Sequence, residues 1–274
     1  MSSRIGLQTF TIRRHLRSPG AIDGAFAEVA ALGIHAVELA YVKLKPAYID
    51  ALEAAGERHG IDFCSSQITF AILDKERDWV VRFHEQLQCP RTAVSVLPFP
   101  ASRGNRDKLL NFADKLEALG AWYRGRGIQL CFHHHDFEFR RYGDDLGLDL
   151  LLGSTSPEHV ALELDTYWAH RGGRSPQDMI NDLNGRVQVV HLRDYRIRPR
   201  LFELLPTDTE LGAGNLDLKR IIQTCQATNV PLLAIEQSTS TPYASVERSV
   251  SHLHSLGFSH LLRRPVPATQ GDTA

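Results

Sequence analysis

Short apolar runs alternate with longer amphipathic segments along almost the whole chain. The runs have the length of β-strands, and their near-continuous apolar character is typical of strands that are buried on both faces. Eight strands are predicted, at residues 5–10, 36–39, 62–67, 91–97, 128–133, 160–165, 187–191 and 232–236.

The segments between these runs carry apolar residues at intervals of three and four positions, which is the period of a helix with one buried face. Helices are therefore expected at residues 21–32, 46–59, 105–123, 216–228 and 243–256. Glycine is favoured just after a helix, and proline in its first turn. The expected ends are Gly33, Gly60, Gly127 and Gly257, and further starts are expected at Pro176 and Pro242.

Eight strands that each lead into a helix predict a single (β/α)8 TIM barrel over residues 1–262. An open doubly wound sheet is disfavoured because the first strand leads into Thr9-Phe10-Thr11 instead of a glycine-rich phosphate loop. Long loops are expected at 98–105 and 196–215, on the rim where barrel enzymes hold their active sites. Residues 263–274 are predicted to form a disordered tail.

The composition is that of a globular protein with a large core, with 43% hydrophobic and 23% charged residues among 274. The formal net charge is -1, without a basic block, so neither nucleic acid nor a membrane surface is expected as a partner. A membrane span and the apolar core of a signal peptide are also missing from the pattern, and a cytoplasmic location is the default expectation. A homo-oligomer is compatible with the sequence.

Polar side chains stand at the downstream ends of the last three predicted strands: Asp165, His191 and Glu236. Parallel strands of a barrel end at one rim, so these side chains are expected to lie side by side. Mixed carboxylate and imidazole ligands suit Mn²⁺, Co²⁺, Mg²⁺ or Zn²⁺ and leave positions open for a substrate. The sequence therefore predicts one divalent metal ion.

A fourth ligand is expected from the fifth strand. Its alternate residues Ile128, Leu130 and Phe132 are apolar, as packing against a helix layer requires. The positions between them, including His133 and by extension His135, therefore face the barrel interior. His133 is the predicted ligand.

Other polar residues near these strand ends have two interpretations each. Glu163 is expected to orient a metal ligand or to pair with an arginine, in preference to direct ligation. Glu138 and His135 are candidates for the general acid or base, or for a solvated loop. Trp168 could form a wall for a sugar ring or close the core, and Arg193 could clamp the substrate or form an internal ion pair.

Several stretches resemble the sugar phosphate isomerase/epimerase family of xylose isomerase-like TIM barrels, over nearly the whole chain up to about residue 258. The resemblance lies in residues 5–13, 33–40, 132–139, 163–168, 185–186, 191–194, 211–214 and 235–237.

This resemblance implies a divalent metal and a small-molecule sugar or keto-polyol substrate. The family's epimerases use Glu, Asp, His and Glu as ligands, and the last three carry over to Asp165, His191 and Glu236. The fifth strand departs from that pattern, and its histidine-rich run is closer to the inosose dehydratase-like branch. Relatives often carry His at the position of Gln67 and Lys at the position of Arg193. These two residues, with Glu38 and Trp168, are the expected substrate contacts.

The leading hypothesis is a metal-dependent isomerase or epimerase that abstracts a proton next to a carbonyl and forms an enediolate, with Glu236 and a partner from strand five moving the proton. A dehydratase of a keto-polyol or 3-keto-sugar is the nearest alternative, because it shares the first step. An endonuclease IV-like hydrolase is more distant, since it needs a trinuclear zinc cluster and a basic groove. A barrel that only binds a ligand is the last alternative.

Overall fold

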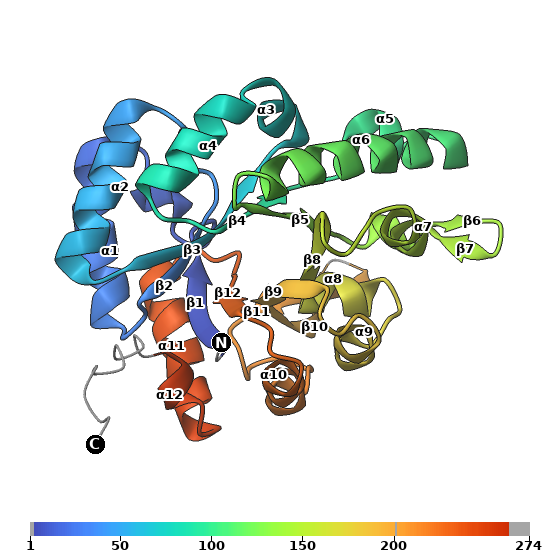
Figure 1. The fold of residues 1–274 in the computed structure, drawn as a ribbon. Coiled ribbons are helices and arrows are strands. Elements are labelled where there is room, and N and C mark those ends of the chain that lie inside the picture. The colour runs from blue at the N-terminus through green and yellow to red at the C-terminus, as the bar shows by residue number, and fades with distance from the viewer. Residues whose placement is uncertain (1–2, 201, 263–274) are drawn as a thin grey trace, which may run out of the picture.

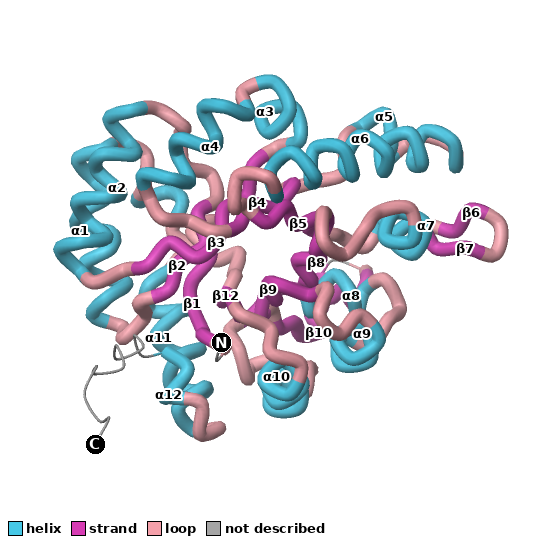
Figure 2. The backbone as a smooth tube through the Cα atoms, in the orientation of Figure 1, coloured by secondary structure: helices cyan, strands magenta, loops and turns pink. Residues whose placement is uncertain are grey.

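Eight parallel strands form a closed barrel in a computed structural model that describes residues 3–200 and 202–262. Figures 1 and 2 show the strands at the centre, with helices arranged around them. Around the barrel the order is β1, β12, β9, β8, β5, β4, β3, β2. The strands are β1 (Arg4–Gln8), β2 (Ala36–Leu39), β3 (Asp62–Ile68), β4 (Arg91–Val94), β5 (Gln129–His133), β8 (Val160–Asp165), β9 (Val187–Leu192) and β12 (Leu232–Ile235).

The (β/α)8 prediction is therefore confirmed, and each predicted strand is present with small differences at its ends. The expected disordered tail, residues 263–274, lies outside the described residues.

The predicted helices and their boundaries are also found. Gly60 ends α2 in the left-handed conformation with φ 64°, and the other three expected glycines also have positive φ. Ser175 caps α9 by accepting a hydrogen bond from the Asp178 N–H. The helices are α1 (Pro19–Ala31), α2 (Pro46–His59), α3 (Phe70–Lys75), α4 (Arg77–Gln86), α5 (Phe99–Ser102), α6 (Arg106–Arg124), α7 (Gly147–Gly153), α8 (Thr166–Arg171), α9 (Pro176–Asp182), α10 (Leu218–Ala227), α11 (Pro242–Ser255) and α12 (Ser259–Leu262), with 3-10 turns η1 (Arg13–His15) and η2 (Phe137–Phe139).

Small side chains pack inside the barrel, and large ones pack between the barrel and the helices. Ala93, Cys131 and Ala161 form one buried interior cluster. Phe132, the next residue of β5, points outward, and its ring centroid lies 6.2 Å from that of Phe112 on α6. This alternation confirms that odd-numbered positions of β5 face inward, as predicted for His133.

An antiparallel hairpin of β10 (Asp194–Arg200) and β11 (Glu203–Thr209) follows β9. The long loop predicted at 98–105 contains α5, and the one predicted at 196–215 was wrong up to Thr209, because those residues form this hairpin. Its charged residues and prolines obscure the strand pattern, and pairing between the two strands stabilises it more than a buried face does, since Ile197 is 48% and Leu204 68% exposed. A smaller hairpin joins β6 (Arg141–Tyr142) and β7 (Asp145–Leu146). Within the described residues no helix is long and apolar enough to cross a bilayer.

The buried His84 on α4 gives a prediction for acid stability. Its Nδ1 lies 2.7 Å from the Cys89 carbonyl oxygen and its Nε2 3.0 Å from Ser66 Oγ. Burial lowers the pKa of His84 from 6.5 to about 4. The unfolded chain therefore takes up this proton at higher pH than the folded protein, and His84 makes folding less favourable as the pH falls through that range.

We expect His84→Gln to be less stable than the wild type near neutral pH, because it loses a buried hydrogen bond. The difference between their free energies of unfolding should narrow by roughly 1–2 kcal/mol as the pH is lowered to about 5, since glutamine takes up no proton on unfolding. Urea unfolding at several pH values measures this. Parallel stability curves for the two proteins would contradict the assignment.

Candidate active site

Strand register brings the predicted site residues together at the carboxyl end of the barrel. Asp165, the last residue of β8, is the register partner of His191 on β9. In the same way His133, the last residue of β5, is paired with Glu163 on β8. Glu236 directly follows β12, which neighbours β9. Residues from four segments of the chain thus meet on one side of the barrel.

His191 is the centre of this cluster and is completely buried. Its Nδ1 lies 2.8 Å from Glu236 Oε2 and 3.8 Å from Asp165 Oδ2. Its Nε2 lies 2.8 Å from Glu38 Oε1 and 3.2 Å from Glu163 Oε1. One imidazole therefore contacts four carboxylates, two on each ring nitrogen.

The residues on the Nδ1 side fit a divalent metal ion. His133, Asp165 and His191 each offer a ligand atom, and these atoms lie within 4.8 Å of one another. Nδ1 of His191 and Oε2 of Glu236 are buried close together, yet they lack the geometry of a hydrogen bond. Donor atoms bound to one cation at about 2.0–2.2 Å would be separated by distances of this order. Such a mixed set suits a borderline or hard divalent cation.

On the Nε2 side Glu38, Glu163 and His191 form a second group of possible ligands, but their hydrogen bonds fit an orienting role. A metal-bound histidine typically donates its other N–H to a carboxylate, and the hydrogen bond from His191 to Glu38 has this form. Glu163 Oε1 lies 3.3 Å from Nδ1 of His133 and accepts a hydrogen bond from the Gln67 amide at 2.6 Å. Glu163 thus contacts both imidazoles, which is the arrangement expected of a carboxylate that orients ligands.

Arg193 adds positive charge at the same carboxylates. Its Nη1 lies 3.4 Å from Asp165 Oδ2 and 3.2 Å from Glu236 Oε1, and its Nη2 lies 2.7 Å from Asp208 Oδ2. The guanidinium also faces the Trp168 ring at 5.5 Å. Arg193 is therefore an internal ion-pair partner that reaches the surface of the site.

The surroundings divide the titratable groups into charged and neutral ones. Burial opposes protonation of His191, but Glu38 and Glu163 raise its pKa well above the usual value. Burial likewise opposes ionisation of Glu236, yet Arg193 and His191 lower its pKa to about 2. Burial raises the pKa of Asp165 to about 6, against the effect of Arg193.

The histidines of the strand-five run are neutral at neutral pH. Burial lowers the pKa of His133 well below its usual value, that of His134 to about 3 and that of His135 to about 4. Neutral imidazoles can bind a metal or accept a proton. Nε2 of His134 accepts a hydrogen bond from the Asp165 N–H at 3.2 Å, which holds the end of β8.

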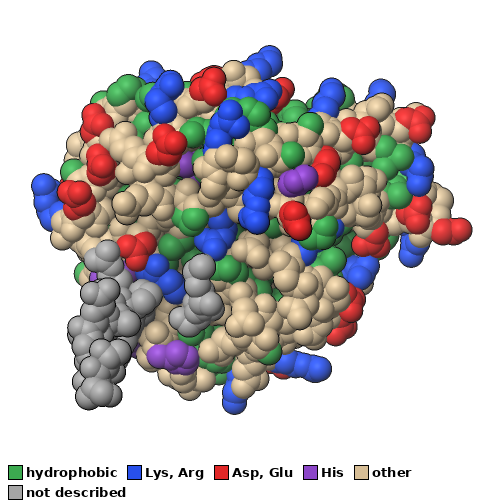
Figure 3. Space-filling view, in the orientation of Figure 1, with side chains coloured by type: hydrophobic (Ala, Val, Ile, Leu, Met, Phe, Trp, Pro, Cys, Tyr) green, Lys and Arg blue, Asp and Glu red, His purple; other side chains and the backbone are tan. Residues whose placement is uncertain are grey.

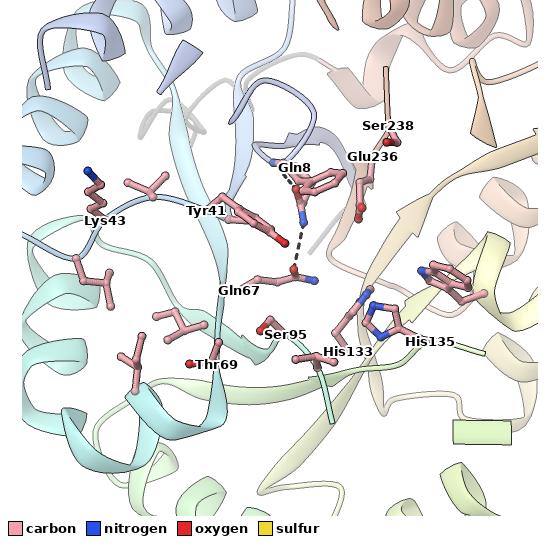
Figure 4. A pocket seen from close by; sticks show the side chains of 18 of the residues that line it. Gln8, Tyr41, Lys43, Gln67, Thr69, Ser95, His133, His135, Glu236 and Ser238 are labelled. Atoms are coloured by element: carbon pink, nitrogen blue, oxygen red, sulfur yellow. Dashed lines mark hydrogen bonds between the residues drawn. The ribbon is translucent and has the colours of Figure 1, made fainter. Parts of the chain in front are cut away.

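A cavity of about 800 Å³ opens above the cluster. Figure 4 shows Glu236, His133 and His135 at one end of it, near the hydrogen-bonded pair of Gln8 and Gln67. Of the predicted residues, those in its wall are Gln67, His133, His135, Trp168, Arg193 and Glu236.

The other predicted residues lie outside the cavity wall. Asp165 and His191 are completely buried beneath it. Glu38 is completely buried in the barrel and contacts His191, so the structure does not bring it to the substrate side. Glu138 lies behind His135, accepting a hydrogen bond from its backbone N–H at 2.8 Å, and burial raises its pKa to about 8.

Sequence reasoning did not find the contribution of Asp208. This residue lies in β11, far from Arg193 in the predicted loop, and only the hairpin brings the two side chains together. Asp194 also has a role that its position did not reveal: its carboxylate accepts hydrogen bonds from the N–H groups of Gly212, Gly214 and Leu216. It thereby anchors the segment that follows the hairpin.

Comparisons with known proteins agree with this architecture. The family model described as xylose isomerase-like TIM barrel matches residues 26–255. The chain therefore belongs to the xylose isomerase-like TIM barrel family, and the resemblance drawn from its motifs is confirmed.

Individual relatives are more distant. An inosose dehydratase from Clostridium beijerinckii is 29% identical over 92 residues, which are 34% of this chain and 30% of that protein. The structure of a sugar phosphate isomerase/epimerase from Parabacteroides distasonis has a TM-score of 0.76 at 18% identity, covering 94% of this chain and 96% of the other. A xylose isomerase-like TIM barrel protein from Mycobacterium smegmatis, solved in complex with magnesium, has a TM-score of 0.70 at 14% identity, covering 95% and 100%. At these identities the two structures show the shared fold alone.

The cluster predicts how two buried carboxylates differ in metal binding. Asp165→Asn should weaken Mn²⁺ binding at least about tenfold, because it removes a charged donor from the set around His191. Glu138→Gln is the matched control: this carboxyl is also buried, belongs to neither group of possible ligands and is protonated near neutral pH. Isothermal titration calorimetry with Mn²⁺ measures both. Equal losses in the two variants would contradict the proposed site.

Proposed function

We propose that the protein is a divalent-metal-dependent isomerase or epimerase of a sugar or keto-sugar. The observation that carries this proposal is the buried cluster of carboxylates and imidazoles at the floor of a cavity, at the end of the barrel where enzymes of this fold place their chemistry. The family assignment and the relatives that act on sugars support the choice of substrate class.

In this proposal His133, Asp165, His191 and Glu236 hold the metal. When bound, the metal polarises a carbonyl and an adjacent hydroxyl, which makes the C–H between them more acidic. Arg193 lies beside two of these carboxylates and lines the cavity, so it can contact the oxygens of a substrate bound there.

Glu236 and His135 move the proton. Glu236 is ionised at neutral pH and lines the cavity, so it can take the proton from the carbon beside the carbonyl. The electron pair of that C–H bond then forms the enediolate. Return of the proton to the neighbouring carbon, with transfer of the hydroxyl proton to the former carbonyl oxygen, completes an isomerisation. Delivery of a proton to the first carbon from the opposite side completes an epimerisation; because His135 is neutral, a water molecule that it contacts would supply this proton. The hydroxide left behind then takes the proton from Glu236, which restores both groups.

A dehydratase acting on a keto-polyol or 3-keto-sugar is the second candidate. The similarity to an inosose dehydratase favours it, although the match covers about a third of the chain. The first step is the same proton removal, but the electron pair then expels a β-hydroxyl group, which takes up a proton and leaves as water. Glu236 would act as the base, and in its protonated form it would then supply the proton to the leaving hydroxyl.

A nucleic-acid hydrolase fits less well. Among the described residues the possible ligand groups comprise only two histidines and three carboxylates, fewer than a trinuclear zinc cluster needs. Figure 3 shows acidic and basic side chains interspersed over the face in view, whereas a phosphate backbone requires a concentrated positive surface. A barrel that only binds a ligand is distinguished by the experiment below.

We expect the Mn²⁺-loaded protein to incorporate deuterium from D₂O into a keto-inositol, 3-keto-sugar or ketose. Inversion or a shifted carbonyl in the labelled product, read by NMR, identifies an isomerase, and loss of water identifies a dehydratase. Glu236→Gln should lower the exchange rate at least about a hundredfold, because an amide is not a proton acceptor. Ser238→Ala, in the same cavity wall, is the control that should retain most of the exchange. A wild-type protein that binds Mn²⁺ but exchanges none of these C–H groups would argue for a pure binding role.

A further inference from the structure

The cavity continues well beyond the cluster, toward the loops that follow β2, β3 and β4. Figure 4 shows its two ends: Glu236, His133 and His135 lie on one side, and Lys43 and Thr69 on the other. A pocket of about 800 Å³ is of the size that holds a drug-like ligand, which is larger than a simple hexose. The proposed reaction needs only the end beside the cluster.

Apolar side chains dominate the second end. We call it the apolar arm and define it by Val42, Leu44, Ile68, Ile72 and Val96, all of which line the cavity. Val96 is 40% exposed. Val42, Leu44 and Ile72 are half-buried, so part of this wall faces the open cavity, and a ligand that covers it removes apolar surface from water. A sugar hydroxyl gains nothing from such a wall, whereas an apolar group does.

Tyr41 adds an aromatic surface at the mouth of the arm. The residue has a φ of 57°, in the left-handed region that a tyrosine rarely occupies, and its side chain is 72% exposed. Its ring centroid lies 5.2 Å from that of Phe10, which also lines the cavity. Figure 4 shows the Tyr41 ring reaching over the cavity toward Gln8 and Gln67. A strained backbone that holds an exposed ring over a cavity is typical of a ligand-binding position.

Charged groups at this end lie on the rim. Lys43 and Lys45 are exposed, and Glu76 is exposed in the same wall, so the positive charge is partly balanced. The other polar lining residues at this end are the uncharged Thr69, which is exposed, and Ser95, which is half-buried. The chemistry of the arm therefore matches an uncharged apolar group better than a phosphate.

We infer that the substrate is a sugar conjugate whose apolar, aromatic substituent lies in the apolar arm against Tyr41, while its sugar ring lies at the cluster. The arm and Tyr41 determine specificity, and none of these residues is among those proposed to bind the metal or to move the proton. The inference rests on the proposed function only for the placement of the sugar.

Paired phenyl and methyl glycosides of glucose, galactose and xylose test this inference. They are titrated into the Mn²⁺-loaded protein, with dissociation constants from calorimetry or saturation-transfer NMR. We expect the phenyl glycoside to bind at least about tenfold more tightly than the methyl glycoside of the same sugar, because the ring removes apolar surface from water. Tyr41→Ala and Val96→Asp should each reduce this preference at least about threefold. Phe99→Ala is the matched control, since Phe99 is also 72% exposed but does not line the cavity.

Equal affinities of paired glycosides, or no binding of any phenyl glycoside, would overturn the inference. So would tighter binding of the corresponding sugar phosphates, which would assign the rim lysines to a phosphate. The Mn²⁺ titration and the deuterium exchange are independent of these results. A protein that binds Mn²⁺ and exchanges C–H protons without a phenyl preference refutes the apolar arm alone, and a protein that fails those two assays refutes the proposed function.

Discussion

Compensation of buried negative charge is the constraint on which the site depends. Glu38, Glu163, Asp165 and Glu236 all contact one imidazole and are all buried, and an ionised carboxylate is costly to bury without a positive partner. Arg193 and a protonated His191 supply part of that charge. A divalent cation on the Nδ1 side would supply the rest and would replace the proton there. The same arrangement thus explains both the raised pKa of His191 and its suitability as a ligand.

The barrel holds these charged side chains in fixed positions relative to one another. The side chains that meet in the cluster are separated by long stretches of sequence, and hydrogen-bonded register between parallel strands fixes their relative heights. Beneath them, the small side chains of Ala93, Cys131 and Ala161 form a buried cluster in the barrel interior. The neutral His134, which holds the Asp165 N–H, adds a further fixed contact at the rim.

Much of this organisation could be predicted from the sequence because it follows from local patterns. The eight strands and the inward direction of His133 follow from the spacing of apolar residues in the sequence. The helix ends follow from the preference of glycine for the position after a helix. How far a side chain lies from the cavity could not be predicted in this way. Glu38 and Glu138 are carboxylates near strand ends, as site residues are, but both are buried outside the cavity wall: Glu38 contacts His191, and Glu138 accepts a hydrogen bond from the His135 backbone. The partnership of Asp208 with Arg193 depends on a hairpin whose charged sequence resembles a loop.

That hairpin has a consequence for how the protein can diversify. Arg193 belongs to the segment that leaves β9, but one of its carboxylate partners comes from β11, outside the barrel. Lengthening or replacing the exposed part of the hairpin would leave the barrel strands untouched, while shifting the anchor that restrains the guanidinium. The charge presented to a bound molecule could therefore be retuned during evolution through an appendage, without remodelling the scaffold that supports it.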